Sequence, residues 1–399
     1  MKILALGGCG NMGREALRAL LLEKDKIDRV TVADINFDSA QKFVKTLRDS
    51  RVDALKVDAS NRSQLVKALK GYDLVMNTVG PYYRFAAPVV KAAIETGINY
   101  IDICDDVEPT MELLKLNQEA RDAGVFIVIG LGASPGLTNL IAKDLAQPLD
   151  QVDEIIIAWV VGEETEEEEV GGLSEGQAVI EHMLHISTGK VITFRGGKHI
   201  KVPAFRVGLK LPFPKPLGKY KCYHVAHPEV VTLPDHIPGV RTVSNLGSLY
   251  PEINNFVFQQ FSKAIEAGKY TIPSAALEII KLMEEQAEEE RKKGGEKKPS
   301  PSGLYLAAIG MMGGERGQNY YTTCSYEPMS VSTGQPLACG TILFARGGSI
   351  DPGVHPPEAV FNLSDILEIA SRYDLAFSRE SESVVDAGWS KKIISAVKS

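Results

Sequence analysis

The 399-residue chain is poor in the features that mark several protein classes. Its cysteines are odd in number and scattered, with no C-x-x-C pair, which argues against a disulfide framework and a structural zinc site. Lys and Arg number 44 against 51 Asp and Glu, with no basic stripe, so nucleic acid is not an expected partner. No apolar run reaches the ~20 residues of a membrane helix. We therefore expect a cytoplasmic protein with free thiols, no membrane and no metal.

A glycine-rich turn directly follows the first apolar run, and residues 1–13 read MKILALGGCGNMG. Gly8, Gly10 and Gly13 have the G-x-G-x-x-G spacing of a dinucleotide-binding loop. The first glycine permits the tight turn, the second lets a pyrophosphate approach the backbone, and the third lets the helix pack on the strand. The phosphate is expected at the helix N-terminus. Cofactor contacts are predicted along the whole loop: Gly8, Cys9, Gly10, Asn11, Met12 and Gly13.

The second apolar run, residues 29–34, ends in an acid about 20 residues after the glycines. The Asp34 carboxylate is placed to accept from a ribose hydroxyl, and it would repel a 2′-phosphate. The following Ile35, Asn36 and Phe37 provide no Arg to neutralise such a phosphate. NAD is therefore predicted in preference to NADP. A solvated acid that caps the next helix is the alternative interpretation of Asp34.

Strand and helix signals alternate up to residue 131, which predicts an α/β fold with a Rossmann-type, doubly wound parallel sheet. Further strands are expected at 52–58, 72–80, 99–106 and 125–131, with helices at 61–69, 85–96 and 107–124. Ligands bind outside the carboxyl ends of such strands. The rule predicts cofactor contacts from these strand ends, at Asp58, Thr78, Val79, Gly80 and Asp102.

From about residue 151 the pattern changes to longer strands, which predicts a second, α+β domain with an antiparallel or mixed sheet. We expect a nucleotide-binding domain at 1–132, a second domain at 133–330 and a C-terminal segment at 331–399. The acidic run at 163–169 is interpreted as a solvated loop, with a mobile lid as the alternative.

Several stretches together resemble the saccharopine dehydrogenase family, in particular its lysine 6-dehydrogenase-like branch. They are residues 7–13 (GGCGNMG), 77–83 (NTVGPYY), 100–106 (YIDICDD), 130–139 (GLGASPGLTN), 333–336 (TGQP) and 353–358 (GVHPPE). The resemblance implies an NAD(P)-dependent oxidoreductase acting on the CH–NH or CH–NH2 group of an amino acid. It also implies that the second domain binds substrate and forms a homodimer, while the C-terminal segment returns to the first domain.

Within this family the reaction itself stays open. L-lysine 6-dehydrogenase is the leading hypothesis, since the stretch ASPGLTN at 133–139 departs from the saccharopine-forming pattern. The alternatives are a reductive condensation that forms saccharopine or carboxynorspermidine, and a homospermidine-synthase-like transferase that keeps NAD bound. A regulator that binds the nucleotide without catalysis is the last alternative.

An acidic cluster ends the expected strand at 99–106. Amine oxidation needs a base that removes the ammonium proton. Asp105 is the first candidate and Asp106 the second, whereas Asp102 is more structural in character. The alternative for either candidate is a cap on the helix that begins near Val107.

Two tyrosines and several anion-binding groups complete the predicted site. Tyr83 is a catalytic candidate and Tyr82 a substrate contact, since either ring could wall the nicotinamide; core packing is the alternative. The substrate carboxylate requires a cation or a helix N-terminus. The candidates are Arg84, Arg206, Ser134 and Gly172.

Overall fold

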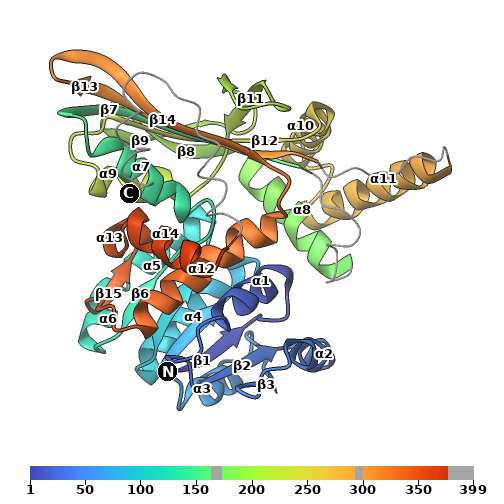
Figure 1. Cartoon of the computed structure of the whole chain (residues 1–399). Coiled ribbons are helices and arrows are strands. Elements are labelled where there is room, and N and C mark those ends of the chain that lie inside the picture. The colour runs from blue at the N-terminus through green and yellow to red at the C-terminus, as the bar shows by residue number, and fades with distance from the viewer. Residues whose placement is uncertain (163–172, 293–299, 376–399) are drawn as a thin grey trace. The chain divides into compact units, whose positions relative to one another are not determined.

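The computed structural model describes residues 1–162, 173–292 and 300–375 (Figure 1). Residue contacts divide the chain into two compact units. The first contains residues 1–144 and the described residues from 329 onward, and the second contains residues 145–328. Within the described ranges, no helix is both long and apolar enough to cross a bilayer.

The first unit is built on a seven-stranded sheet in which every neighbouring pair is parallel. The strand order is β15-β6-β5-β4-β1-β2-β3. The strands are β1 (Lys2–Leu6), β2 (Arg29–Asp34), β3 (Val52–Lys56), β4 (Leu74–Asn77), β5 (Asn99–Asp102), β6 (Phe126–Val128) and β15 (Gly353–His355). The central strands β1 and β4 are almost wholly buried, as expected for a sheet covered on both faces.

The helices of this unit are α1 (Asn11–Leu20), α2 (Phe37–Leu47), α3 (Arg62–Leu69), α4 (Tyr82–Thr96), α5 (Val107–Leu114), α6 (Asn117–Asp122), α7 (Leu137–Ala146), α12 (Met329–Ala345), α13 (Pro357–Val360) and α14 (Leu363–Arg372). Helices α1 to α6 lie between consecutive strands of the sheet, α7 and α12 lead to and from the second unit, and α13 and α14 follow the last strand. Helix α12 packs against α1 and α14, while α4 packs against α3 and α5 (Figure 1). The strand order reverses between β1 and β4, so their carboxyl ends mark the switch point at which such sheets bind ligands.

The second unit is built on a mixed sheet with the order β10-β11-β12-β7-β13-β14, and β8 and β9 extend from β12. The strands are β7 (Gln151–Val161), β8 (Lys190–Arg195), β9 (Lys198–Pro203), β10 (Gly208–Pro212), β11 (Lys219–His224), β12 (Thr242–Leu249), β13 (Ser302–Met312) and β14 (Glu315–Ser325). The pair β7–β12 is parallel and the others are antiparallel. The helices are α8 (Leu173–Ser187), α9 (Glu229–His236), α10 (Glu252–Glu266) and α11 (Ile272–Lys292).

The predicted fold class, a Rossmann-type parallel sheet plus an α+β unit with a mixed sheet, is confirmed. Several element bounds were wrong. The helix expected at 85–96 begins at Tyr82, and the single helix expected at 107–124 is the pair α5 and α6. The seventh strand, β15, was not predicted. The acidic run at 163–169 lies outside the described residues.

Candidate active site

In the loop between β1 and α1, the positions of Gly7 and Gly13 leave no room for a side chain. Gly7 has a φ of +75°, and a Cβ there would lie 2.9 Å from the backbone of Thr78 and Val79. A Cβ on Gly13 would lie 2.7 Å from Gly7 O and from Gly8 Cα. The left-handed residue of the turn is therefore Gly7, which precedes the first glycine of the G-x-G-x-x-G spacing. Gly13 has its predicted role of close packing.

The end of α1 that faces this loop is open to an anion. Gly10 is the N-cap of α1 with no side-chain cap, so the first N–H groups of the helix are not used by a cap. Asn11 and Met12 are half-buried at the start of the helix, and Cys9 is 5% exposed. The carbonyl of Cys9 accepts a hydrogen bond from Arg14 Nε at 2.5 Å. A turn that lacks Cβ atoms at Gly7, Gly8 and Gly10, placed at a helix N-terminus, fits a dinucleotide pyrophosphate.

The two acids predicted at the adenosine lie after neighbouring strands. Asp34 ends β2 and is half-buried, and its Oδ1 accepts from Asn36 N–H at 2.9 Å. Asp58 follows β3, and its Oδ1 accepts from the N–H and hydroxyl of Ser60. Those hydrogen bonds, the side-chain one first, lower the pKa of Asp58. Both carboxylates are thus oriented by their own turns.

The loop after β4 lies against the glycine loop. Thr78 N–H donates to Leu6 O at 2.8 Å, and a Cβ on Gly13 would lie 2.8 Å from Thr78 Oγ1. Thr78 and Val79 are half-buried and Gly80 is exposed. This loop therefore borders the expected cofactor site, where the sequence predicts cofactor contacts from Thr78, Val79 and Gly80.

The two tyrosines differ in environment because α4 begins at Tyr82. Tyr82 is 7% exposed, and its hydroxyl donates to Asn77 O at 3.1 Å. Burial, reinforced by the charge of Asp102, raises the pKa of Tyr82. Tyr83 is 44% exposed, and the neighbouring Arg84 places its guanidinium 5.0 Å from the Phe85 ring centre. Tyr82 therefore packs in the core, whereas Tyr83 and Arg84 are accessible.

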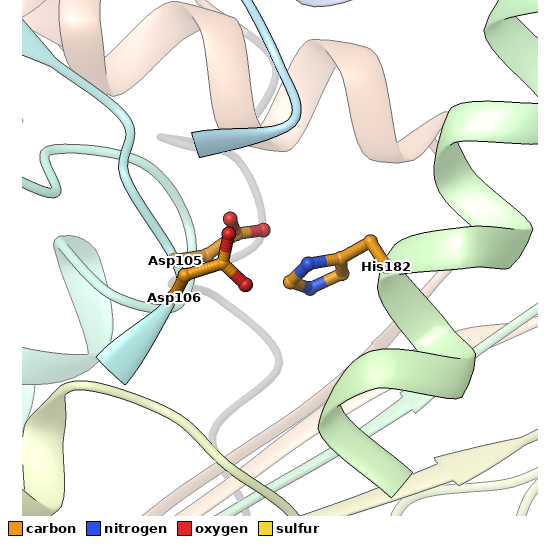
Figure 2. Close-up of side chains that lie close together, drawn as sticks. All are labelled: Asp105, Asp106 and His182. Carbon is orange, nitrogen blue, oxygen red and sulfur yellow. The ribbon is translucent and has the colours of Figure 1, made fainter. Parts of the chain in front are cut away.

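The acids after β5 occupy three distinct environments. Asp102 is fully buried, Asp106 is 1% exposed and Asp105 is half-buried. The carboxylates of Asp105 and Asp106 lie side by side, with oxygens within 4.8 Å of one another (Figure 2). Asp106 occupies the N-cap position of α5, yet its Oδ2 accepts from Tyr83 N–H, at 3.0 Å, in the first turn of α4. The alternative interpretation of Asp106 as a cap on α5 is therefore wrong, because its carboxylate caps α4 instead.

Cys104, which lies between these acids, is fully buried. Burial, together with the nearby carboxylates of Asp102, Asp106 and Asp105, raises the pKa of its thiol. A thiol in that environment is a poor nucleophile.

The remaining predicted substrate residues are Ser134, Arg206 and Gly172. Ser134 is half-buried before the cis peptide to Pro135. In the second unit, Arg206 donates to Glu266 at 2.7 Å. Gly172 lies outside the described residues. His182 projects from α8, as Figure 2 shows.

Sequence reasoning missed several buried polar residues. Asn77 begins the 77–83 stretch and Tyr100 the 100–106 stretch, but the sequence does not indicate that their side chains hydrogen-bond to each other at 2.8 Å. Glu358 is fully buried, and its Oε2 accepts from Asn139 Nδ2 at 2.9 Å. This bond joins the 130–139 and 353–358 motifs within the first unit, which explains why both are polar at those positions.

Comparison with known proteins finds a family match in the first unit and relatives that align with part or most of the chain. Residues 3–128 match the family described as saccharopine dehydrogenase NADP binding domain. Carboxynorspermidine synthase of Vibrio cholerae serotype O1 is 22% identical over 399 residues, covering 89% of this chain and 91% of that protein. The saccharopine dehydrogenase-like oxidoreductase of Rattus norvegicus is 39% identical over 92 residues, 23% of this chain and 21% of that protein.

Among solved structures, apo saccharopine dehydrogenase (L-Glu forming) from Saccharomyces cerevisiae shares the fold. The two chains superpose with a TM-score of 0.64 at 18% identity, covering 94% of this chain and 98% of the yeast chain. At this identity the likeness concerns the fold.

Proposed function

Because residues 3–128 of this chain match the family described as saccharopine dehydrogenase NADP binding domain, we propose that the protein is an NAD(P)-dependent oxidoreductase acting on a carbon–nitrogen bond of an amino acid. One observation carries the proposal. The glycine cradle after β1 and the acids after β5 stand at carboxyl ends separated only by β4. Cofactor-binding and proton-transfer groups are thus provided on neighbouring strands of one sheet.

The cofactor is held, in this proposal, by the backbone from Gly7 to Gly13 and by the loop at 78–80. When bound, the nicotinamide supplies the hydride acceptor or donor. Asp34 favours NAD because its carboxylate repels a 2′-phosphate. The family description names NADP, and Arg14 of α1 stacks 4.8 Å from the ring of Phe43 on α2, so a cation is present in this region. Comparing KM for NAD and NADP in the wild type and in Asp34→Asn tests the preference for NAD.

Asp105 is the proposed general base. The substrate amine must lose a proton before the adjacent carbon can release a hydride. Asp105 is half-buried, whereas Asp106 is 1% exposed and accepts a hydrogen bond from Tyr83 N–H. Two neighbouring carboxylates also favour a cationic group between them, such as the ammonium of a diamino acid. Asp106 is the second candidate, and Tyr83 is proposed to contact the reacting end of the substrate.

The substrate carboxylate is assigned first to Arg84, which is exposed beside Tyr83. Ser134 and Arg206 stay as weaker candidates, since Arg206 already pairs with Glu266. Gly172 is kept from the sequence prediction alone. A homodimer and a cytoplasmic location are likewise proposals that rest on the resemblance.

The leading specific reaction is that of L-lysine 6-dehydrogenase, in which the amine is oxidised. A second candidate is a reductive condensation of an amine with an aldehyde or keto acid. It is favoured by the relative that aligns along nearly the whole chain, which is a carboxynorspermidine synthase. Both reactions use the same base, because the proton that leaves the amine in oxidation returns to nitrogen in reduction.

The test measures formation and consumption of reduced nicotinamide by absorbance. Purified protein is given NAD or NADP with L-lysine, saccharopine, ornithine and diamines. In the reverse direction it is given NADH or NADPH with an amine and a keto acid or aldehyde. Oxidation of one amine supports the dehydrogenase, and consumption only when both reactants are present supports condensation. Cofactor binding without turnover in either direction would contradict the proposed oxidoreductase.

Two variants test the base. Asp105→Asn is expected to lower turnover by ~10²-fold or more while leaving the cofactor Kd unchanged. Asp122→Asn is the matched control, because Asp122 is an exposed acid on α6 of the same unit. A rate in Asp105→Asn equal to that of the control would transfer the assignment to Asp106, and full activity in both Asp105→Asn and Asp106→Asn would rule out this acid pair.

A further inference from the structure

A chain of hydrogen bonds links three fully buried side chains at the ends of β4 and β5. Asn77 Nδ2 donates to the Tyr100 hydroxyl at 2.8 Å, and that hydroxyl donates to Asp102 Oδ2 at 2.6 Å. All three residues are 0% exposed. The chain therefore cannot be reached by a substrate, and its role must be sought in what it holds.

The ends of this chain hold the loops that follow three neighbouring strands. Asn77 Oδ1 accepts from Val79 N–H, at 3.1 Å, in the loop after β4. Asp102 Oδ1 accepts from Cys104 N–H at 2.9 Å, after β5, and from Gly130 N–H at 2.7 Å, after β6. The first loop borders the glycine cradle and the second carries Asp105. One buried chain thus joins the backbone of all three loops.

The direction of every bond in the chain is fixed by the ionised form of Asp102. The Asp102 carboxylate accepts from the Tyr100 hydroxyl and from two backbone N–H groups. If Asp102 were protonated at Oδ2, its O–H would have to donate to the Tyr100 oxygen, whose own hydrogen already points at Asp102. Burial raises the pKa of Asp102 to about 6, although hydrogen bonds from Tyr100, Cys104 and Gly130 oppose the rise, and the charge of Asp105 adds to it. The other titratable groups that face it are Tyr82 and Cys104.

This carboxylate is costly for folding. Because the pKa is higher in the folded chain than in the unfolded one, ionisation of Asp102 opposes folding as the pH rises through about 6. A buried charge with a stability cost is often retained for function rather than for stability.

We propose that Asn77, Tyr100 and Asp102 are positioning residues, which hold the loops after β4, β5 and β6 in the single arrangement that brings the cofactor cradle and Asp105 into register. The inference rests on the proposed function for its kinetic consequence. None of the three residues touches the substrate.

Tyr100→Phe is the first test, with Tyr72→Phe as the matched control. Tyr72 also donates from a hydroxyl inside the first unit, to Thr31 Oγ1 at 2.8 Å, but before β4 rather than after it. Tyr100→Phe is expected to accelerate amide exchange at Val79, Cys104 and Gly130 by about 10-fold, the effect of ~1.4 kcal/mol. It should also lower kcat more than it raises KM for the amine. Tyr72→Phe should leave these amides and both constants unchanged.

The exchange readout does not require a known substrate, so it separates this inference from the proposed function. Faster exchange at the three amides in a protein that turns over no amine would support the positioning role and contradict the oxidoreductase. Equal exchange in Tyr100→Phe and Tyr72→Phe would overturn the positioning role, whatever the activity.

Asp102→Asn supplies a pH signature that a merely structural role would not give. The hydrogen bonds from Tyr100, Cys104 and Gly130 lower the pKa of Asp102, so a local opening that breaks them while the carboxyl stays buried is favoured by protonation. In the wild type, protection of the three amides, relative to the rest of β4–β6, should therefore fall as the pH drops through about 6. The neutral Asn should abolish this pH dependence. Protection in the wild type that stays constant from below to above pH 6 would contradict the role of the ionised carboxylate.

Discussion

The two units differ in what their buried polar groups hold. In the first unit, Asn77, Asp102 and Asp106 accept hydrogen bonds from loop or helix-start N–H groups at the carboxyl ends of the strands. In the second unit, Trp159 Nε1 donates to Asn245 Oδ1 at 3.1 Å between two strands, so the polar contact braces the sheet itself. Loops positioned by a rigid scaffold are where binding groups concentrate. Among these contacts, those of the first unit hold the loops of the predicted site, and the one in the second unit supports the sheet.

Gly13 in the first unit and Gly247 in the second differ in what an added Cβ would contact. A Cβ on Gly13 would strike the backbone of the cofactor loop, at 2.7 Å from Gly8 Cα. A Cβ on Gly247 of β12 would strike the indole of Trp159, at 2.4 Å from Cη2. The same substitution to alanine thus disturbs a ligand-binding loop in one unit and a side-chain stack in the other.

The largest effect is expected from Gly13→Ala. Backbone cannot move aside as a side chain can, so the loop must shift, and overpacking of this kind costs ~1–3 kcal/mol. If that cost falls on the cofactor-bound arrangement, the Kd for NAD or NADP rises by ~10-fold or more, as titration calorimetry would measure. Gly97→Ala is the control, since Gly97 ends α4 at a φ of +70° with nothing within 4 Å of its Cβ. It should lose stability but keep its cofactor affinity, and an unchanged Kd in Gly13→Ala would remove the steric argument.

How far the sequence predicts this molecule depends on the range of the interaction. The parallel sheet follows from local patterns, because strands such as β1 and β4 are short apolar runs buried on both faces. The glycine spacing predicts a cofactor loop, but it carries no information on φ and did not indicate that the left-handed residue is Gly7. Strand β15 has only three residues and is followed by two prolines, so its sequence gives no strand pattern, and it is recognised as a strand only by its pairing with β6.

The candidate site was predictable as a set of loops, but not in its hydrogen bonding. A cap on the adjacent helix was the alternative interpretation of Asp106, and its carboxylate instead accepts from the N–H of Tyr83, 23 residues earlier in the chain. The partner of Arg206 is Glu266, 60 residues later. Such pairings arise from topology, and the sequence of one loop does not contain them.

Gly247→Ala is expected to have an intermediate effect, confined to the second unit. The indole must tilt or move, which costs ~1–3 kcal/mol in free energy of unfolding, measured in all variants by urea titration with circular dichroism. The cofactor Kd should not change. In a Trp159→Phe background the smaller ring relieves the clash, so the cost of Gly247→Ala should shrink in a double-mutant cycle. An equal cost in both backgrounds would show that the indole is not the obstacle, and a raised cofactor Kd would break the contrast between the units.

The smallest effect is expected from Arg206→Met. The side chains of Arg206 and Glu266 are 37% and 32% exposed, and ion pairs of that kind contribute at most ~1 kcal/mol to stability. The guanidinium is also occupied by Glu266, so KM for an amino-acid substrate should change by less than ~2-fold, which corresponds to under ~0.5 kcal/mol. Arg84→Met is the comparison, because an accessible cation that binds a carboxylate contributes ~1.5–3 kcal/mol and its loss should raise KM by ~10-fold or more. The test is steady-state kinetics of both variants with an amino acid and with a diamine, which lacks a carboxylate. The KM for the diamine should be unchanged in Arg84→Met. A larger KM effect for Arg206→Met than for Arg84→Met would assign the substrate carboxylate to the second unit, and would show that its exposed polar residues also serve binding.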